Sequence, residues 1–184
     1  MFSRFILLVA VSFLIASCSD PKPVDPKKEA IPFAIPGATE EVKQKHEDGT
    51  HKLSVFYKEG TQEKVAEVQF HPNGQPYINK RFERDTLNGE SWSYYADGKP
   101  WSLNTFKNGR YDGIYRTWHD NGQLNIDGHY KDGVEDGEWF TYYPTGTLNT
   151  RGIYRNGKKS GVWSSYNLQG TLIREEDFTT ADVH

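Results

Sequence analysis

Several residue types and sequence features are scarce in this 184-residue chain, and each scarcity excludes a class of fold or function. Cysteine occurs once, as Cys18, so no disulfide can form within the chain. An excess of positive charge is also missing. The formal net charge is −3, which argues against nucleic acid and anionic lipid headgroups as partners. The apolar stretch from Phe5 to Leu14 is much shorter than the roughly 20 residues that a bilayer span needs.

Motifs for catalysis and metal binding are absent as well. The chain contains no Gly-x-Ser-x-Gly, no His-Glu-x-x-His and no phosphate-binding glycine loop. Its six histidines, among them His119 in an expected turn, show no metal-ligand spacing. Residues 131–136 are rich in oxygen donors, but residues 155–160 fill the equivalent place with cations, which excludes a repeated calcium site. We therefore expect no enzyme activity, no cofactor and no metal.

What the chain does contain is a period of 24 residues. One set of glycines recurs at this interval, as Gly74, Gly98, Gly122, Gly146 and Gly170, and a second set recurs as Gly89, Gly113, Gly137 and Gly161. A fixed period of this length indicates one small structural unit, copied so that neighbours share a single extended core. The copies divide residues 65–184 into five repeats.

Each repeat holds two short runs rich in aromatic residues and threonine, separated by turn residues. The turns that end in the first glycine set, such as Pro72-Asn73-Gly74, suit a three-residue hairpin loop with a left-handed glycine. Asn108-Gly109 and similar pairs join one repeat to the next without room for a helix. The sequence therefore predicts an all-β fold, an elongated antiparallel meander of tandem β-hairpins with about ten strands.

The side-chain pattern predicts part of the packing. A three-residue loop places Tyr142 opposite Leu148, and alternation then places Gly152 and Tyr154 on the same face. Trp139 falls on the other face unless a bulge intervenes, and the sequence leaves this open. The copies also differ at both ends of the array. In the second copy Ser91 and Trp92 replace the usual order, and in the last copy residues 175–177 are acidic, which is typical of a protected edge strand.

The segment before the repeats has features of a targeting signal. Residues 1–17 have the layout of a secretory signal, and Leu14-Ile15-Ala16-Ser17-Cys18 resembles the bacterial lipobox, which implies lipidation of Cys18. Ser19 follows that cysteine, and resemblance to the lipoprotein sorting rule implies anchoring at the outer membrane. Residues 18–50, rich in proline and charge, predict a disordered tether, and residues 51–64 predict a capping strand.

The repeat pattern Gly-x-Trp-x-x-Tyr-x-x-x-Gly-x-Leu, followed by Gly-x-Tyr-x-Asn-Gly, resembles the bacterial MORN-repeat variant over about residues 65–178. This resemblance implies twisted arrays of β-hairpins that serve as interaction modules. Some bacterial members of the family resemble the antitoxin or immunity half of a toxin–antitoxin pair, so a toxin is one partner that the resemblance suggests.

Three functions remain open from the sequence. The first is a lipid-anchored module that binds a protein and contacts the membrane only through its anchor. The second is a glycan-binding module that uses surface tryptophans, although aromatic residues also dominate small β cores. The third is a structural spacer in the envelope. The candidate binding surface is the face that alternates away from Tyr142 and Leu148, with residues Trp139, Tyr143, Arg151, Ile153, Arg116 and His119.

Overall fold

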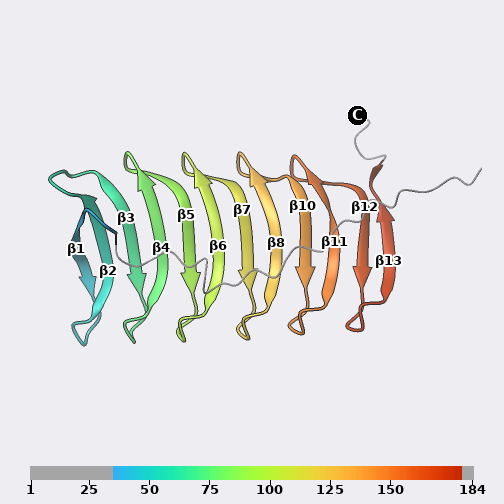
Figure 1. Cartoon of the computed structure of the whole chain (residues 1–184), viewed down its shortest axis with the longest axis horizontal. Helices are drawn as coiled ribbons and strands as arrows, with labels where there is room; N and C mark the ends of the chain where they lie inside the picture. The colour runs from blue at the N-terminus through green and yellow to red at the C-terminus, as the bar shows by residue number, and fades with distance from the viewer. Residues whose placement is uncertain (1–34, 180–184) are drawn as a thin grey trace, which may run out of the picture.

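The computed structural model describes residues 35–179. The expected signal sequence, Cys18 and the first part of the expected tether lie outside the described residues. The described part forms one antiparallel sheet of 13 strands and contains no α-helix, which confirms the all-β meander (Figure 1). The strands are β1 (Ala38–Lys45), β2 (His51–Lys58), β3 (Lys64–Phe70), β4 (Pro76–Glu83), β5 (Thr86–Tyr94), β6 (Pro100–Lys107), β7 (Arg110–Trp118), β8 (Leu124–Lys131), β9 (Val134–Glu135), β10 (Gly137–Tyr142), β11 (Leu148–Arg155), β12 (Lys158–Tyr166) and β13 (Leu172–Asp177).

The strands follow one another across the sheet in chain order, so almost every contact is between sequence neighbours (Figure 1). The short strand β9 pairs with β8 beside β10, and β9 and β10 together form one arm of a hairpin. The expected hairpins are therefore all present, as β3–β4, β5–β6, β7–β8, β9/β10–β11 and β12–β13.

Both kinds of turn have the expected geometry. In the loop after β3 the His71 amide donates to the Gln75 carbonyl at 2.8 Å, and the Gly74 amide donates to the His71 carbonyl at 2.9 Å. Gly74 has φ of 79°, the left-handed value that glycine adopts without steric cost. Between repeats, Asn108 and Gly109 both have positive φ, at 50° and 79°, as a two-residue hairpin turn requires.

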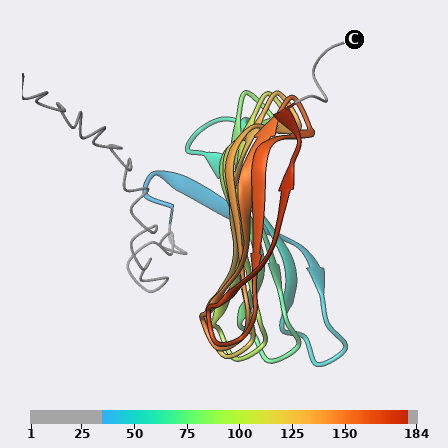
Figure 2. The same cartoon turned by 90° about the vertical axis from the view of Figure 1, so that its right-hand side faces the viewer.

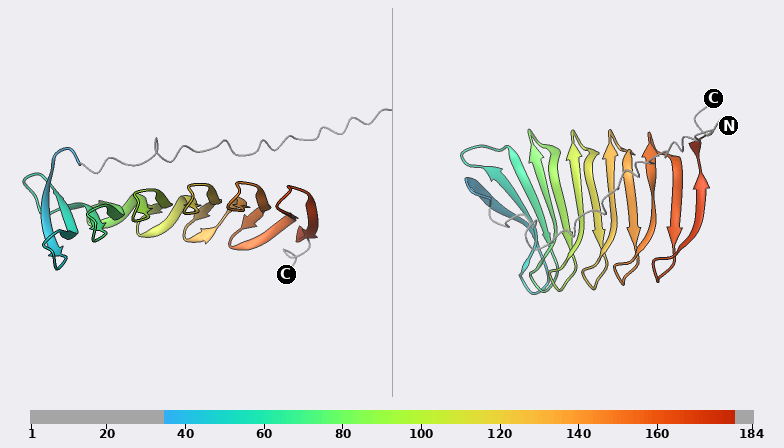
Figure 3. Two further views of the ribbon diagram at one scale, coloured as in Figure 1. Left: turned by 90° about the horizontal axis from the view of Figure 1, so that it is seen from below. Right: turned by 45° about the vertical axis from the view of Figure 1, so that its right-hand side comes forward.

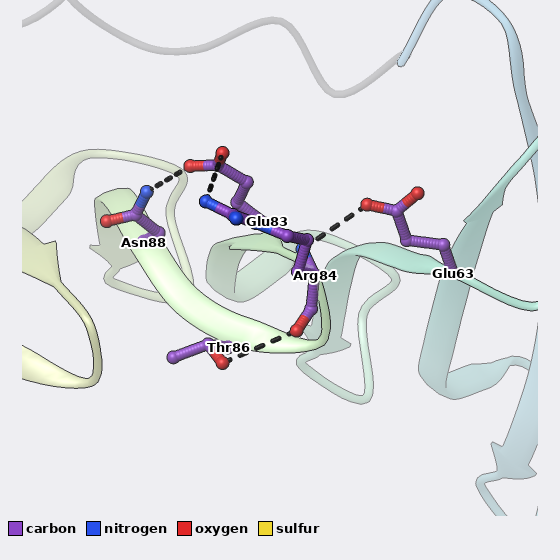
Figure 4. Close-up of polar contacts among 5 residues, drawn as sticks. All are labelled: Glu63, Glu83, Arg84, Thr86 and Asn88. Atoms are coloured by element: carbon purple, nitrogen blue, oxygen red, sulfur yellow. Dashed lines mark hydrogen bonds and ion pairs between the residues drawn. The ribbon is translucent and has the colours of Figure 1, made fainter.

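One of these connections lacks glycine. Between β4 and β5 the left-handed positions are held by Arg84 and Asp85, with φ of 49° and 60°. Figure 4 shows how the surrounding side chains hold this turn: the Arg84 amide donates to a Glu63 carboxylate oxygen at 3.3 Å, and the Thr86 hydroxyl donates to the Arg84 carbonyl at 3.4 Å. The Asn88 side-chain amide donates to a Glu83 carboxylate oxygen at 2.5 Å.

The amino-terminal boundary of the fold differs from the expected one. The expected tether through residue 50 includes β1, which pairs with β2, so the expectation of disorder is wrong for residues 38–45. Gly49, with φ of 86°, closes a loop like the others, because its amide donates to the His46 carbonyl at 3.0 Å. Burial explains the order of this segment, since Ile35 and Ala38 pack against an apolar cluster on β2 and β3.

The sheet is a single curved layer in which the strands of successive repeats superpose, and β1 departs from their common direction (Figures 2 and 3). The expectation of one continuous core is wrong. Most of the buried apolar side chains among the described residues form two clusters, one of Phe56, Ala66, Val68 and Phe70 and another of Trp92, Tyr94, Leu103 and Trp118. Beyond these clusters the carboxyl-terminal repeats pack their aromatic rings in a different way, on the opposite face.

Candidate interaction surface

The two faces of the sheet differ in chemistry, and strand register decides which residues each face carries. Trp139 lies directly opposite Gly152, and the next pair along is Phe140 opposite Arg151. Successive side chains of a strand point to opposite faces. We call the side with Trp139 and Gly152 the ladder face, and the side with Phe140 and Arg151 the groove face.

A β-bulge reverses part of the expected face assignment. Tyr142 does pair with Leu148, as the three-residue loop predicts. However, the register shifts between the pairs of Thr141 and Tyr142, where Asn149 is an extra residue of β11, and the alternation of β11 restarts there. The Thr141 and Thr150 hydroxyls meet at 2.7 Å on the ladder face, whereas Tyr142 and Leu148 lie on the groove face. The expectation that Gly152 and Tyr154 share the face of Tyr142 is therefore wrong.

The ladder face takes its name from a continuous row of aromatic rings. Neighbouring rings have centroid separations between 4.6 and 6.4 Å, and the offset or edge-on geometries are those that aromatic pairs prefer. The row consists of Phe106, Tyr111, Tyr130, Tyr115, Trp139, Tyr154 and Trp163. At its end the Lys159 ammonium lies 4.4 Å from the centroid of Trp163.

Two of these rings lie directly on glycines of the preceding repeat. A Cβ placed on Gly128 would be 2.2 Å from Cε3 of Trp139, and a Cβ on Gly152 would be 2.2 Å from Cδ2 of Trp163. Only glycine leaves room for the indole at these positions. The Gly-x-Trp element of one repeat and the second-strand glycine of the previous repeat are thus two halves of one packing contact.

The second repeat departs from this scheme because its tryptophan is shifted by one residue. Ser91 stands where the ladder tryptophan would be, and Trp92, opposite Leu103, points to the groove face. There Trp92 stacks on Trp118 at 5.8 Å and on Tyr94 at 6.3 Å. A shift of one residue therefore moves the buried aromatic group from one face of the sheet to the other.

The groove face carries a shallow groove of about 460 Å³ over strands β10 to β13. Its floor is apolar, with Phe140, Ile153 and Val162, and the last two are 40% and 51% exposed. Its polar lining consists of Glu138, Arg151, Ser164 and Glu175. The Ser164 hydroxyl donates to Glu175 at 3.1 Å, and the Arg151 guanidinium lies 5.9 Å from the centroid of the Tyr166 ring.

The electrostatics of the two faces differ accordingly. On the groove face the Arg116 guanidinium donates to Asp127 at 2.8 Å, and both side chains are mostly buried. On the ladder face burial, followed by the nearby Glu135 carboxylate, raises the pKa of Tyr130 to about 12. Burial also raises the pKa of Tyr115 and Tyr154. These three tyrosines are therefore neutral at ordinary pH and act as packing groups.

The comparison with protein families matches this geometry to a known repeat. The model of the MORN repeat variant matches residues 87–108, 111–132 and 135–156. The chain carries three tandem MORN repeats. They are the central hairpins of the array, β5–β6, β7–β8 and β9/β10–β11, and the hairpins on either side continue the same period.

Comparisons with whole proteins add little to the MORN assignment. Among curated proteins there is no significant match. Among solved structures, the chain is similar to a point mutant of S. aureus TarM in complex with fondaparinux, α-GlcNAc-glycerol and UDP, at 11% identity and a TM-score of 0.27. A second crystal structure of TarM gives 10% identity and the same TM-score. The aligned parts cover 68% and 67% of this chain but 21% of each TarM chain, and a similarity this low says nothing about function.

The MORN array separates the residues of the expected binding surface. Arg151 and Ile153 line the groove, and Arg116 lies on the same face on β7, three strands away from β11. Trp139 is on the ladder face, so its placement on one surface with Arg151 and Ile153 is wrong. These two residues also share the face of Tyr142, because the bulge in β11 moves them there.

His119 and Tyr143 belong to a third location, the loop end of the MORN hairpins. The Tyr143 hydroxyl donates to the Tyr166 carbonyl at 3.0 Å, and Nε2 of His119 lies 3.0 Å from the Tyr142 carbonyl oxygen. His71 and Tyr95 make the same contact with the carbonyl 23 residues further on, at 2.9 Å in each case. These side chains tie each loop to the next repeat, so their role is structural.

Sequence reasoning missed several groove residues, namely Glu138, Phe140, Val162, Ser164 and Glu175. Val162 offered a signal, because it stands one repeat after Glu138, so an aliphatic group replaces a charged one at an exposed position. The remaining residues could not be assigned to the groove without the register across the bulge.

Within residues 35–179 no group of three histidine, cysteine, aspartate or glutamate side chains is placed to hold a metal ion. The same residues include no helix of the length and apolarity that crossing a membrane requires.

Proposed function

We propose that this chain is a lipid-anchored protein-interaction module that binds its partner through the groove face over β10 to β13. MORN repeats generally act as modules for protein or membrane interaction. The net charge of −3 disfavours an anionic membrane surface as the ligand, because such surfaces attract basic segments. A protein is therefore the favoured partner.

The observation that carries this proposal is the exposed apolar floor of the groove. Ile153 and Val162 are 40% and 51% exposed, and they lie on the neighbouring strands β11 and β12. Neighbouring aliphatic groups that stay exposed on a sheet form an apolar patch, and such patches mark interaction sites. An apolar centre with charged groups at its rim, here Glu138 and Arg151, is the usual composition of a protein interface.

The ladder face is less suited to binding, which disfavours the glycan alternative. Its rings pack against one another and, at Trp139 and Trp163, against glycine backbone. Within the row only Tyr111, at 38%, is among the strongly exposed side chains. Sugar stacking requires a free ring face, and most ring faces here are already in contact.

The lipid anchor and the cellular localisation are part of the same proposal. The lipobox-like sequence ending at Cys18 supports lipid attachment at the outer membrane, with the module held in the bacterial envelope. The antitoxin or immunity role is a narrower form of this proposal, and it requires that the partner be a toxin.

Site-specific photocrosslinking in the host cells tests the proposal. A photoreactive phenylalanine analogue placed at Val162 of the full-length protein should give one discrete protein adduct, and the same analogue at Tyr111 on the ladder face should give none. Ile153→Asp should abolish the Val162 adduct, because a carboxylate in the apolar floor is costly to desolvate. Equal adducts from both faces, or no adduct at Val162 in a folded protein, would contradict the proposal. Fatty-acid labelling of the same protein, lost in Cys18→Ser, tests the anchor.

A further inference from the structure

The last strand of the sheet has an unpaired edge within the described part of the chain, where β13 pairs only with β12. The Phe178 amide donates to the Gly161 carbonyl at 2.9 Å, which marks these two residues as a hydrogen-bonded pair. Hydrogen-bonded and non-hydrogen-bonded pairs alternate along antiparallel strands. Glu176 therefore directs its backbone groups toward β12, whereas Glu175 and Asp177 direct their amide and carbonyl groups away from the sheet.

The side chains of these outward-facing residues lie beside the groove. Glu175 pairs with Ser164 and Asp177 pairs with Val162, so both carboxylates are on the groove face. Further along the same strand, Leu172 and Ile173 are 47% and 63% exposed. One edge thus offers free backbone donors and acceptors together with acidic and aliphatic side chains.

The charge at this edge favours a cationic ligand. On the groove face β13 itself carries the carboxylates of Glu175 and Asp177, which would adjoin an added strand, whereas Arg151 lies two strands further in, on β11, over the Tyr166 ring. A strand laid along β13 would place every second side chain over these carboxylates. Lysine or arginine at those positions gains attraction, and like charges directly opposite one another are destabilising.

The same charges disfavour a second copy of this chain. An antiparallel pair of β13 strands related by a two-fold axis at Glu175 would oppose that carboxylate with its own copy. Acidic edge strands protect natural sheets from this kind of self-association. Pairing of β13 with a second copy of itself is therefore disfavoured, and pairing with a strand of opposite charge is favoured.

We propose that β13 accepts an extended segment of the protein partner, in which basic and aliphatic residues alternate, as an additional strand of the sheet. Main-chain hydrogen bonds to Glu175 and Asp177 supply affinity, and the carboxylates of the same two residues select the basic side chains. This inference rests on the proposed function, and it adds the partner's conformation and charge.

Binding of a synthetic strand to the full-length protein in mild detergent tests the inference. The probe is a fluorescent peptide of about eight residues with alternating lysine and valine, a typical strand length, and its matched control replaces lysine with glutamate. Fluorescence anisotropy should show saturable binding of the lysine peptide only, weakened by added salt. Amide exchange at Glu175 and Asp177 should slow on binding.

Three variants separate charge from backbone pairing. Glu175→Gln should weaken binding about threefold to tenfold, as expected for loss of one charge at an interface. Glu175→Pro should abolish binding, because it also removes an outward amide that β12 does not use, and proline is tolerated at such edge positions. Glu176→Gln, on the ladder face, should change affinity by less than about twofold. Circular dichroism and tryptophan fluorescence confirm that each variant is folded.

Several outcomes would overturn the inference. These are equal binding of the glutamate peptide, undiminished binding by a folded Glu175→Pro variant, and concentration-dependent self-association through β13. If the Val162 crosslink in cells survives Glu175→Pro unchanged, the partner uses the groove without joining the sheet, and the proposed function stands while this inference fails.

Discussion

At the scale of single residues, the contact between tryptophan and glycine explains the repeat pattern. Trp139 covers Gly128 and Trp163 covers Gly152, and both contacts link one repeat to the previous one. The glycines that recur in the turns allow a left-handed backbone conformation, since their φ values are positive. Gly128 and Gly152 instead leave room for a side chain, so glycine has two separate uses in the same repeat.

We predict that Gly152→Ala destabilises the fold by about 1 to 3 kcal/mol, the usual cost of overpacking a core. The added methyl group would lie 2.2 Å from the Trp163 ring and must displace it. Denaturant unfolding measures the loss, and Trp163 fluorescence should change. Gly122→Ala is the control, because nothing lies within 4 Å of its new methyl group and only backbone strain is added. Wild-type stability with unchanged fluorescence in Gly152→Ala would show that the contact is unimportant.

At the scale of the element, the hairpin turns differ in how well their residues suit them. Three connections use Asn-Gly or Asp-Gly, as at Asn108-Gly109, and these residues adopt left-handed φ at low cost. The turn at Arg84-Asp85 has the same shape without either glycine or asparagine. Its side-chain contacts, shown in Figure 4, hold a backbone conformation that arginine disfavours.

We predict that Arg84→Asn stabilises the protein by about 0.5 to 1 kcal/mol, because asparagine tolerates left-handed φ. The Arg84 amide still donates to Glu63, and the exposed ion pair with Glu83 that is lost contributes little. The reverse change, Asn108→Arg, should destabilise by a similar amount. Thermal and denaturant unfolding of the two variants provide the measurement, and shifts in the same direction would refute the argument.

At the scale of the whole molecule, stability should be nearly a sum over hairpins and the contacts between neighbours. Almost all strand pairs join sequence neighbours, so a complete repeat can be removed in register. Compatibility then depends on which residues the deletion brings together. The tryptophan of the repeat after the deletion must pack on a glycine of the repeat before it.

Two deletions of equal length should therefore behave differently. Removing residues 137–160 places Trp163 over Gly128, a pair equivalent to the native ones, so the fold should survive and the urea m-value should fall by about a sixth. Removing residues 113–136 places Trp139 over Asn104, whose side chain occupies the space of the ring, and should destabilise far more. Circular dichroism and urea unfolding of both proteins test this, and equal stability of the two would contradict the pairing rule.

The sequence alone determined the repeat, the hairpins and both kinds of turn, because these depend on residues close together in the chain. Glycine spacing and Asn-Gly pairs report local backbone geometry directly. The Glu47-Asp48-Gly49 turn carried the same information, but it lies 25 residues before Gly74, out of register, and the first hairpin was missed for that reason. The candidate surface was only partly predicted, with Arg151 and Ile153 in the groove and Trp139 on the wrong face.

Only the tertiary structure decided which face each side chain occupies. Sequence spacing predicted that Arg151 and Tyr142 lie on opposite faces. A single extra residue in β11 restarts the alternation, so the two side chains lie on the same face. The order of β1 likewise depends on Ile35 and Ala38 reaching a cluster built by later strands. Faces and clusters are properties of strands paired with one another, and a bulge or a distant contact alters them without changing the period of the sequence.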